Sequence, residues 1–159
     1  MPIREFELFH GAVLTKLVRS DTPLTLRMIE TRSGESWSTY KINDEVRLLL
    51  KHSVISRALS RDKSRAWQFV FSPDQMIQVA APTTWCALVC GNKSIADAKM
   101  EICLLDPSQL GVLLDITTRA QQSLMIKRIE GKSLRASSVR ASDIVIARNR
   151  LDSWAVPGS

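Results

Sequence analysis

A run of six apolar residues, from Trp85 to Cys90, constrains most strongly what this chain can fold into. A strand that buries one face alternates apolar and polar residues, whereas a continuous apolar run is typical of a strand covered on both faces. Gly91, Asn92 and Lys93 then end the run. We therefore expect Trp85 to Cys90 to be a central strand, with other elements packed on both sides of its sheet.

The chain before this run predicts a helix followed by three strands. From Ile3 to Arg19, apolar residues recur at intervals of three and four, which is the period of an amphipathic helix. Pro23 follows and cannot continue that helix. Segments of strand character then come at 24–31, 38–43 and 45–53, separated by turn-forming residues. A three-strand meander is the simplest arrangement of these segments.

Short helices and further strands make up the rest of the chain. Trp67, Phe69 and Phe71 share one face of a strand, and we expect that face to lie in the core. Ser72-Pro73 and Asp106-Pro107 each combine a capping side chain with a proline at the first helical position, so a helix is predicted to begin at each. We further expect a loop or helix over 54–65, a strand over 100–105 and a basic hairpin formed by 123–129 and 133–138; residues 143–159 show no clear pattern.

Together these elements predict an α/β fold, of the α+β type with a mixed sheet, in a single domain spanning residues 1–159. The expected order is a helix, the meander, a fourth strand, a short helix, the central strand, and a C-terminal helix and basic hairpin. A content of 45% hydrophobic and 24% charged residues is that of a globular protein. No apolar stretch approaches the roughly 20 residues of a membrane span, and acids in the first turns do not fit a signal peptide. We expect a cytoplasmic protein without membrane contact.

The cysteines and histidines give little support to a metal or nucleophile site. Cys86, Cys90 and Cys103 form no Cys-x-x-Cys pair and are odd in number, so a disulfide framework is not predicted. Cys86 and Cys90 lie four residues apart on one strand face, which favours buried thiols over the alternative of a metal or redox role. His10 and His52 are the only histidines, too few for a His-rich zinc site.

Positive charge is concentrated in two blocks of the sequence. The net charge is +6, while residues 47–65 hold six cations against one acid and residues 117–150 hold eight against two. Arginine dominates both blocks, and its planar fork of donors suits phosphate oxygens and base edges. We therefore predict a nucleic acid as partner, with DNA favoured; ordinary solvated faces are the alternative. The predicted nucleic-acid-binding residues are Arg47, Arg57, Arg61, Lys63, Arg65, Lys127, Arg128, Lys132 and Arg135.

The predicted order of elements resembles the core of the PD-(D/E)xK nuclease superfamily, the fold of restriction enzymes. This resemblance is carried by the order of the elements. The segments Gly11 to Leu14, Tyr40-Lys41-Ile42-Asn43-Asp44, Leu48 to Ser53, Trp67 to Phe71 and Leu88 to Gly91 also resemble an uncharacterised bacterial domain. Such a nuclease uses two acidic side chains to hold Mg²⁺ and a lysine to orient the attacking water. The resemblance thus implies a magnesium-dependent deoxyribonuclease or an inactive relative.

The catalytic residues that the resemblance implies are Glu30, Asp44 and Lys51, with Glu30 and Asp44 as the magnesium ligands. The family places an acid two residues before its lysine, and Leu49 occupies that position here. The alternatives are a surface role for Lys51 and a solvated position at a strand end for each acid. A different class of function is a non-enzymatic interaction or regulatory protein, which pairs with itself as a homodimer or with a partner protein. Trp37 and Trp154 would then serve as anchors.

Overall fold

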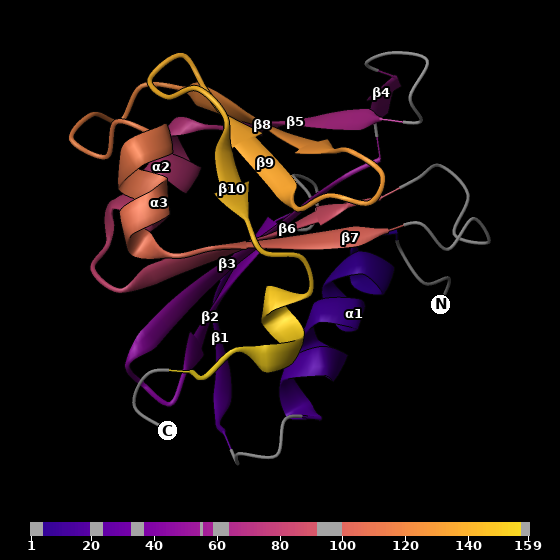
Figure 1. The fold of residues 1–159 in the computed structure, drawn as a ribbon. Helices are drawn as coiled ribbons and strands as arrows, with labels where there is room; N and C mark the ends of the chain where they lie inside the picture. The colour runs from indigo at the N-terminus through magenta and orange to yellow at the C-terminus, as the bar shows by residue number, and fades with distance from the viewer. Residues whose placement is uncertain are drawn as a thin grey trace.

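Two five-stranded sheets packed face to face form most of the protein, together with three α-helices (Figure 1). The structure is a computed structural model that describes residues 5–19, 24–32, 37–54, 56–58, 64–91 and 100–156. The elements in chain order are α1 (Glu5–Val18), β1 (Leu26–Arg32), β2 (Trp37–Ile42), β3 (Val46–Ser53), β4 (Ser56–Ala58), β5 (Arg65–Phe71), α2 (Pro73–Ala80), β6 (Thr84–Cys90), β7 (Glu101–Leu105), α3 (Pro107–Leu113), β8 (Gln122–Arg128), β9 (Leu134–Ser137), β10 (Ile144–Ile146) and the 3-10 helix η1 (Arg150–Ser153). The predicted α+β class with a mixed sheet is confirmed.

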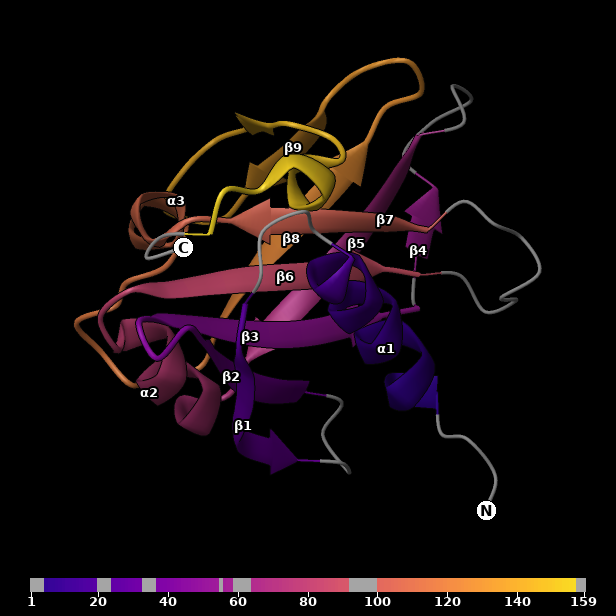
Figure 2. The same ribbon diagram turned by 90° about the horizontal axis from the view of Figure 1, so that it is seen from below.

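The first sheet has the strand order β1-β2-β3-β6-β7, and its central strands β3 and β6 are covered on both faces. Strands β1, β2 and β3 form the predicted antiparallel meander, and β6 lies parallel to β3. One face of β6 packs Cys86 and Leu88 into the core between the sheets, while Ala87 and Val89 face the core beneath α1 (Figure 2). The apolar run is therefore an interior strand buried from both sides, as expected.

The second sheet has the order β10-β9-β8-β5-β4 and packs only one face against the first sheet. The inward side chains of β5, namely Trp67, Phe69 and Phe71, are buried in the core between the sheets. The hairpin β8–β9 pairs with β5 in this sheet, and not with the meander. The alternating pattern of β5 buries one face only, which is what the outer layer of a sandwich requires.

Both predicted helix starts are confirmed. Ser72 Oγ accepts a hydrogen bond from Gln75 N, and Gln75 Oε1 accepts one from Ser72 N, which is a complete capping box. Asp106 and Gln109 do the same for α3. The two helices lie at one end of the two sheets (Figure 1). No helix among the described residues has the length and apolar character needed to cross a membrane.

The tight turn between β2 and β3 sets the register of the first sheet. Asn43 and Asp44 adopt left-handed backbone conformations with φ of 53° and 57°, which these residue types tolerate better than most. Asn43 Oδ1 also accepts a hydrogen bond from Thr25 N at 2.9 Å, joining the turn to the start of β1. Ile42 consequently lies opposite Val46, and Lys41 opposite Arg47.

Candidate nucleic-acid interface

Pairing of β5 with β8 brings the two basic blocks of the sequence together at one end of the second sheet. Arg65 lies directly opposite Arg128. In the neighbouring row Ala66 lies opposite Lys127, and Lys127 in turn lies opposite Arg135 on β9. The backbone of Arg57 on β4 pairs with Ala66 on the other side. Residues about 60 to 80 positions apart in sequence thus meet at this end, with Lys127 and Arg135 on the outer face and Arg65 and Arg128 on the inner side, in line with Trp67 and Ile126.

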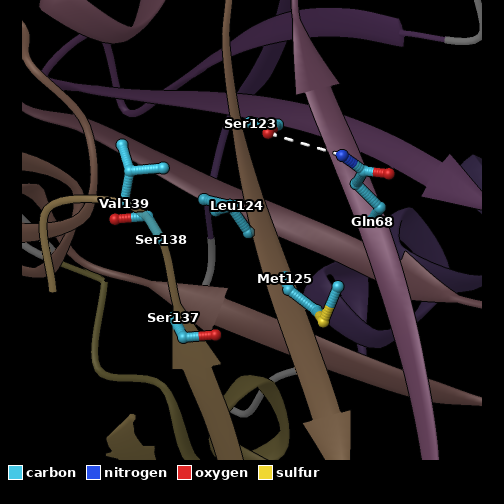
Figure 3. Close-up of a pocket in the computed structure, with 7 residues that line it drawn as sticks. All are labelled: Gln68, Ser123, Leu124, Met125, Ser137, Ser138 and Val139. Carbon is cyan, nitrogen blue, oxygen red and sulfur yellow. Dashed lines mark hydrogen bonds between the residues drawn. The ribbon is translucent and has the colours of Figure 1, made fainter. Parts of the chain in front are cut away.

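Beside these rows, the outer face of the second sheet holds a shallow hollow of about 260 Å³ (Figure 3). Gln68, Met125 and Ser137 lie opposite one another on β5, β8 and β9, and all three line the hollow. This row is two residues from Lys127 and Arg135, or about 7 Å along the strands. The other lining residues are Ser123, Leu124, Ser138 and Val139. Amide, hydroxyl and apolar groups therefore sit next to the cations.

The cations of this region differ in how they are held. Lys127 Nζ forms an ion pair with Asp143 Oδ1 at 3.2 Å, with both side chains partly exposed. The guanidinium carbon of Arg128 lies 5.8 Å from the centroid of the Trp67 ring, which is a cation–π contact. This contact holds the Arg128 side chain at the end of the core. Arg65 is exposed, and Lys132 is exposed at the β8–β9 turn. The group thus combines oriented cations with cations open to solvent.

The remaining predicted nucleic-acid-binding residues lie elsewhere. Arg47 is on β3 of the first sheet, where its Nη1 donates to Gln78 Oε1 at 2.7 Å. Arg61 and Lys63 lie outside the described residues, as does the side chain of Arg57. Of the nine predicted residues, the structure brings five side chains to one end of the second sheet: Arg65, Lys127, Arg128, Lys132 and Arg135.

Lys51 points into the core between the two sheets, so the surface role considered for it is wrong. The residue is 7% exposed, and its Nζ donates to Val70 O at 2.9 Å and to Gln75 Oε1 at 2.8 Å. The ammonium also lies 5.1 Å from the centroid of the Phe71 ring. These contacts tie β3 to β5 and to the capping box of α2. Leu49, at the family's acidic position, is completely buried in the same core.

The described residues do not fit a shared magnesium site. Asp44 is an exposed turn residue, and its Oδ1 lies 3.4 Å from Nη2 of Arg27. It is separated from Lys51 by most of strand β3, about 20 Å. Glu30 lies on β1 opposite Thr39, and its side chain is outside the described residues. Within the part of the chain that the structure describes, no three His, Cys, Asp or Glu side chains gather as metal ligands.

The three thiols are buried and free, which confirms the burial predicted for Cys86 and Cys90. Burial raises the pKa of Cys86 to about 12, with the charge of Lys51 opposing the rise. Burial likewise raises the pKa of Cys103 to about 12, with the charge of Arg150 opposing it, and raises that of Cys90 well above its usual value. The thiolate is the reactive and metal-binding form, so these cysteines are packing residues at neutral pH.

His10 on α1 and His52 on β3 lie together between the helix and the first sheet. His10 Nδ1 is 2.9 Å from Ser38 Oγ, and the two imidazole rings meet edge to face at 5.6 Å. His10 is 3% exposed and Ser38 is 1% exposed. A substrate therefore cannot approach the serine hydroxyl, and the pair serves to pack α1 on the first sheet.

The predicted basic hairpin is present as β8 and β9, and its pairing places Lys127 opposite Arg135. Sequence reasoning missed the hollow on the outer face. Its signal was the alternation of 122–128, where Ser123, Met125 and Lys127 share one face, but the pairing of β8 with β5 was not predictable locally. The proposed tryptophan anchors are also corrected. Trp37 is 1% exposed in the core, and Trp154 is half-buried against the ring of Trp85.

Comparison of the chain with protein-family models, with curated proteins and with solved structures gave no match.

Proposed function

We propose that this protein binds nucleic acid through the outer face and the cationic end of its second sheet. One observation carries the proposal: the β5–β8 pairing assembles two basic blocks, far apart in sequence, beside a hollow lined by hydrogen-bonding side chains. Clustering of cations on one face is the electrostatic footprint of a nucleic-acid-binding protein. DNA remains the favoured partner.

The two parts of the surface would have different roles. Lys127 and Arg135 on the outer face would contact phosphate oxygens, which position a strand without reading its sequence. The amide of Gln68 and the hydroxyl of Ser137, beside Met125, offer hydrogen bonds and an apolar contact to an unpaired base. Because base edges are accessible in single strands, we propose a preference for single-stranded over double-stranded nucleic acid.

Fluorescence anisotropy with labelled oligonucleotides of equal length tests this proposal. Arg135→Gln is the variant, because Arg135 lies on the outer face next to the hollow. Losing one phosphate contact should weaken binding about tenfold at low salt and reduce the slope of log K against log salt by about 1. Its melting temperature should stay that of the wild type, since a change on this face removes no core contact.

Arg19→Gln is the matched control, because Arg19 is exposed at the end of α1, and α1 covers the opposite side of the first sheet. It makes the same change of charge and should leave the salt slope unaltered. Equal losses in both variants would show that only net charge matters and would overturn the proposed surface. Absence of binding by the wild type at low salt would overturn the function itself.

Hydrolysis of the bound DNA is a further part of the proposal. Repeating the incubations with Mg²⁺ and with chelator shows whether DNA is cut, and Asp44→Asn tests the acid that the family resemblance implies. Asp44 is exposed, so this variant should fold normally.

We also propose a cytoplasmic location for the protein. It is supported by the three cysteines, all of them free thiols, which are usual in reducing compartments.

A further inference from the structure

Three cations lie directly opposite one another on the first sheet, away from the proposed nucleic-acid interface. Arg27 on β1 pairs with Lys41 on β2, and Lys41 pairs with Arg47 on β3. Residues directly opposite in antiparallel strands place their side chains on the same face, and like charges in such positions destabilise a sheet. The fold thus gathers positive charge here at a cost to its own stability.

A depression of about 330 Å³ lies at this row. It is lined by Arg27, Met28, Lys41 and Arg47. Its volume is at the small end of the range of ligand sites. The three charged groups therefore line one space in which a single anion can reach them.

Arg47 is held in place by α2. Its Nη1 donates to Gln78 Oε1 at 2.7 Å, and its backbone N donates to Thr83 O at 3.1 Å. A guanidinium fixed by a neutral amide keeps its full charge and several free donor directions. At the other end of the row Asp44 lies 3.4 Å from Arg27, and both are largely exposed, so this ion pair neutralises little. The row retains a net positive charge.

We propose that the row formed by Arg27, Lys41 and Arg47 binds a phosphate group. The arginine forks suit pairs of phosphate oxygens, and the lysine supplies a third charge between them. A bound phosphate would also relieve the repulsion along the row. The same chemistry is offered by a phosphorylated small molecule and by the terminal phosphate of a nucleic-acid strand. The proposal rests on other residues than the proposed nucleic-acid interface and stands independently of it.

Calorimetric titration at low ionic strength tests the site with inorganic phosphate and with adenosine 5′-monophosphate. Lys41→Gln is the variant, because Lys41 is central in the row. We expect about a tenfold loss of phosphate affinity. Without phosphate the variant should melt at the wild-type temperature or higher, because a like-charge contact has been removed. A lysine with a purely structural role would instead lower the melting temperature.

Lys16→Gln is the matched control. Lys16 lies on α1, on the opposite side of the first sheet, in an exposed ion pair with Asp152. Its phosphate affinity should equal that of the wild type. Equal affinity of Lys41→Gln and the wild type would overturn the proposal, as would a wild type that binds phosphate no better than chloride at matched ionic strength.

Two oligonucleotides of one sequence, one with a 5′-phosphate and one with a 5′-hydroxyl, show whether the phosphate ligand is the end of a nucleic-acid strand or a small molecule. Tighter binding of the phosphorylated strand, lost in Lys41→Gln, identifies a strand end as the ligand. Binding of adenosine 5′-monophosphate without any effect of the 5′-phosphate identifies a small molecule. If Arg135→Gln leaves oligonucleotide binding unchanged while Lys41→Gln weakens phosphate binding, the proposed interface fails and this site stands.

Discussion

The two sheets contain the same number of strands but differ in how many of their faces are covered. The first sheet packs α1 on one face and the second sheet on the other, whereas the second sheet turns one face to solvent (Figures 1 and 2). Lys51 on the first sheet is enclosed and hydrogen-bonded to Val70 O and Gln75 Oε1. Lys127 and Arg135 on the second sheet remain within reach of a ligand.

This difference shows that the role of a basic residue depends on whether the part of the sheet that carries it is covered. In sequence, Lys51 and Lys127 both belong to basic blocks. In the structure the first ties two sheets and a helix together, because a buried ammonium must have hydrogen-bond partners. The second forms a partly exposed ion pair with Asp143, and such surface pairs contribute little to stability.

The largest expected effect is on stability, when a charge is placed on the inner face of β5 rather than on its outer face. Phe69 is 1% exposed in the core, whereas its neighbour Val70 is 44% exposed on the outer face. Phe69→Asp should lower the free energy of unfolding by at least about 4 kcal/mol, through lost packing and an unpaired buried carboxylate. Val70→Asp should cost about 1 kcal/mol or less, the range of strand propensities.

Urea denaturation of both variants measures this difference. If the two substitutions cost the same, the outer face of β5 is covered by something in solution, such as a second copy of the chain. That outcome would break the contrast between the sheets and would favour the protein-interaction function over nucleic-acid binding.

A smaller effect is expected at Lys51. Lys51→Ala leaves a cavity and removes the donor to Val70 O and Gln75 Oε1, so we expect a loss of about 2–4 kcal/mol in unfolding free energy. Lys51→Met fills the space and needs no partner for a charge, so it should cost about 1.5 kcal/mol or less.

Denaturant titration of both variants measures the two losses. A fully stable Lys51→Ala protein would contradict the structural role of the lysine.

The smallest effect concerns the thiols and appears only at alkaline pH. The folded pKa of Cys86 and of Cys103 is raised to about 12, while an unfolded thiol titrates near 8.5. Between these values the unfolded state loses the proton and the folded state keeps it, so stability is complete below about pH 8.5 and falls as pH rises.

Between pH 8 and 10, each such thiol should lower the free energy of unfolding by about 1–2 kcal/mol. Cys103→Ala removes the contribution of one thiol, so the free energy of unfolding, measured by urea titration, should decrease less over this pH range. If the variant and the wild type fall equally, Cys103 is not held protonated by burial. Reaction of Cys103 with a thiol reagent in the native protein would likewise show that burial does not protect this thiol.

Much of the fold was predictable because the local signals are strong. The capping residues Ser72 and Asp106 mark both helix starts, and the apolar run from Trp85 to Cys90 identifies an interior strand. The short strands β4 and β10 were missed, since three residues carry no periodicity of their own. Their place in the sheet comes from the neighbouring strands β5 and β9.

The candidate site was only partly predictable. Both basic blocks and the hairpin that carries Lys127 and Arg135 were predicted, but not that Arg65 pairs with Arg128 across β5 and β8 or that Arg47 lies on the other sheet. The row of Arg27, Lys41 and Arg47 was missed because Arg27 and Lys41 lie outside both blocks. A single residue of shift in the β2–β3 turn would have turned each side chain to the other face.

By itself the sequence determined the identity of most elements, the faces of β5 and β6 and the concentration of arginine in two blocks. These properties depend on residues within a few positions of one another, so propensity, capping and alternation specify them. The tertiary structure decided which strands are neighbours and which faces are covered. It paired β5 with β8, enclosed Lys51 and left Lys127 and Arg135 on an open face. Such pairings depend on packing between distant segments, which no local pattern contains.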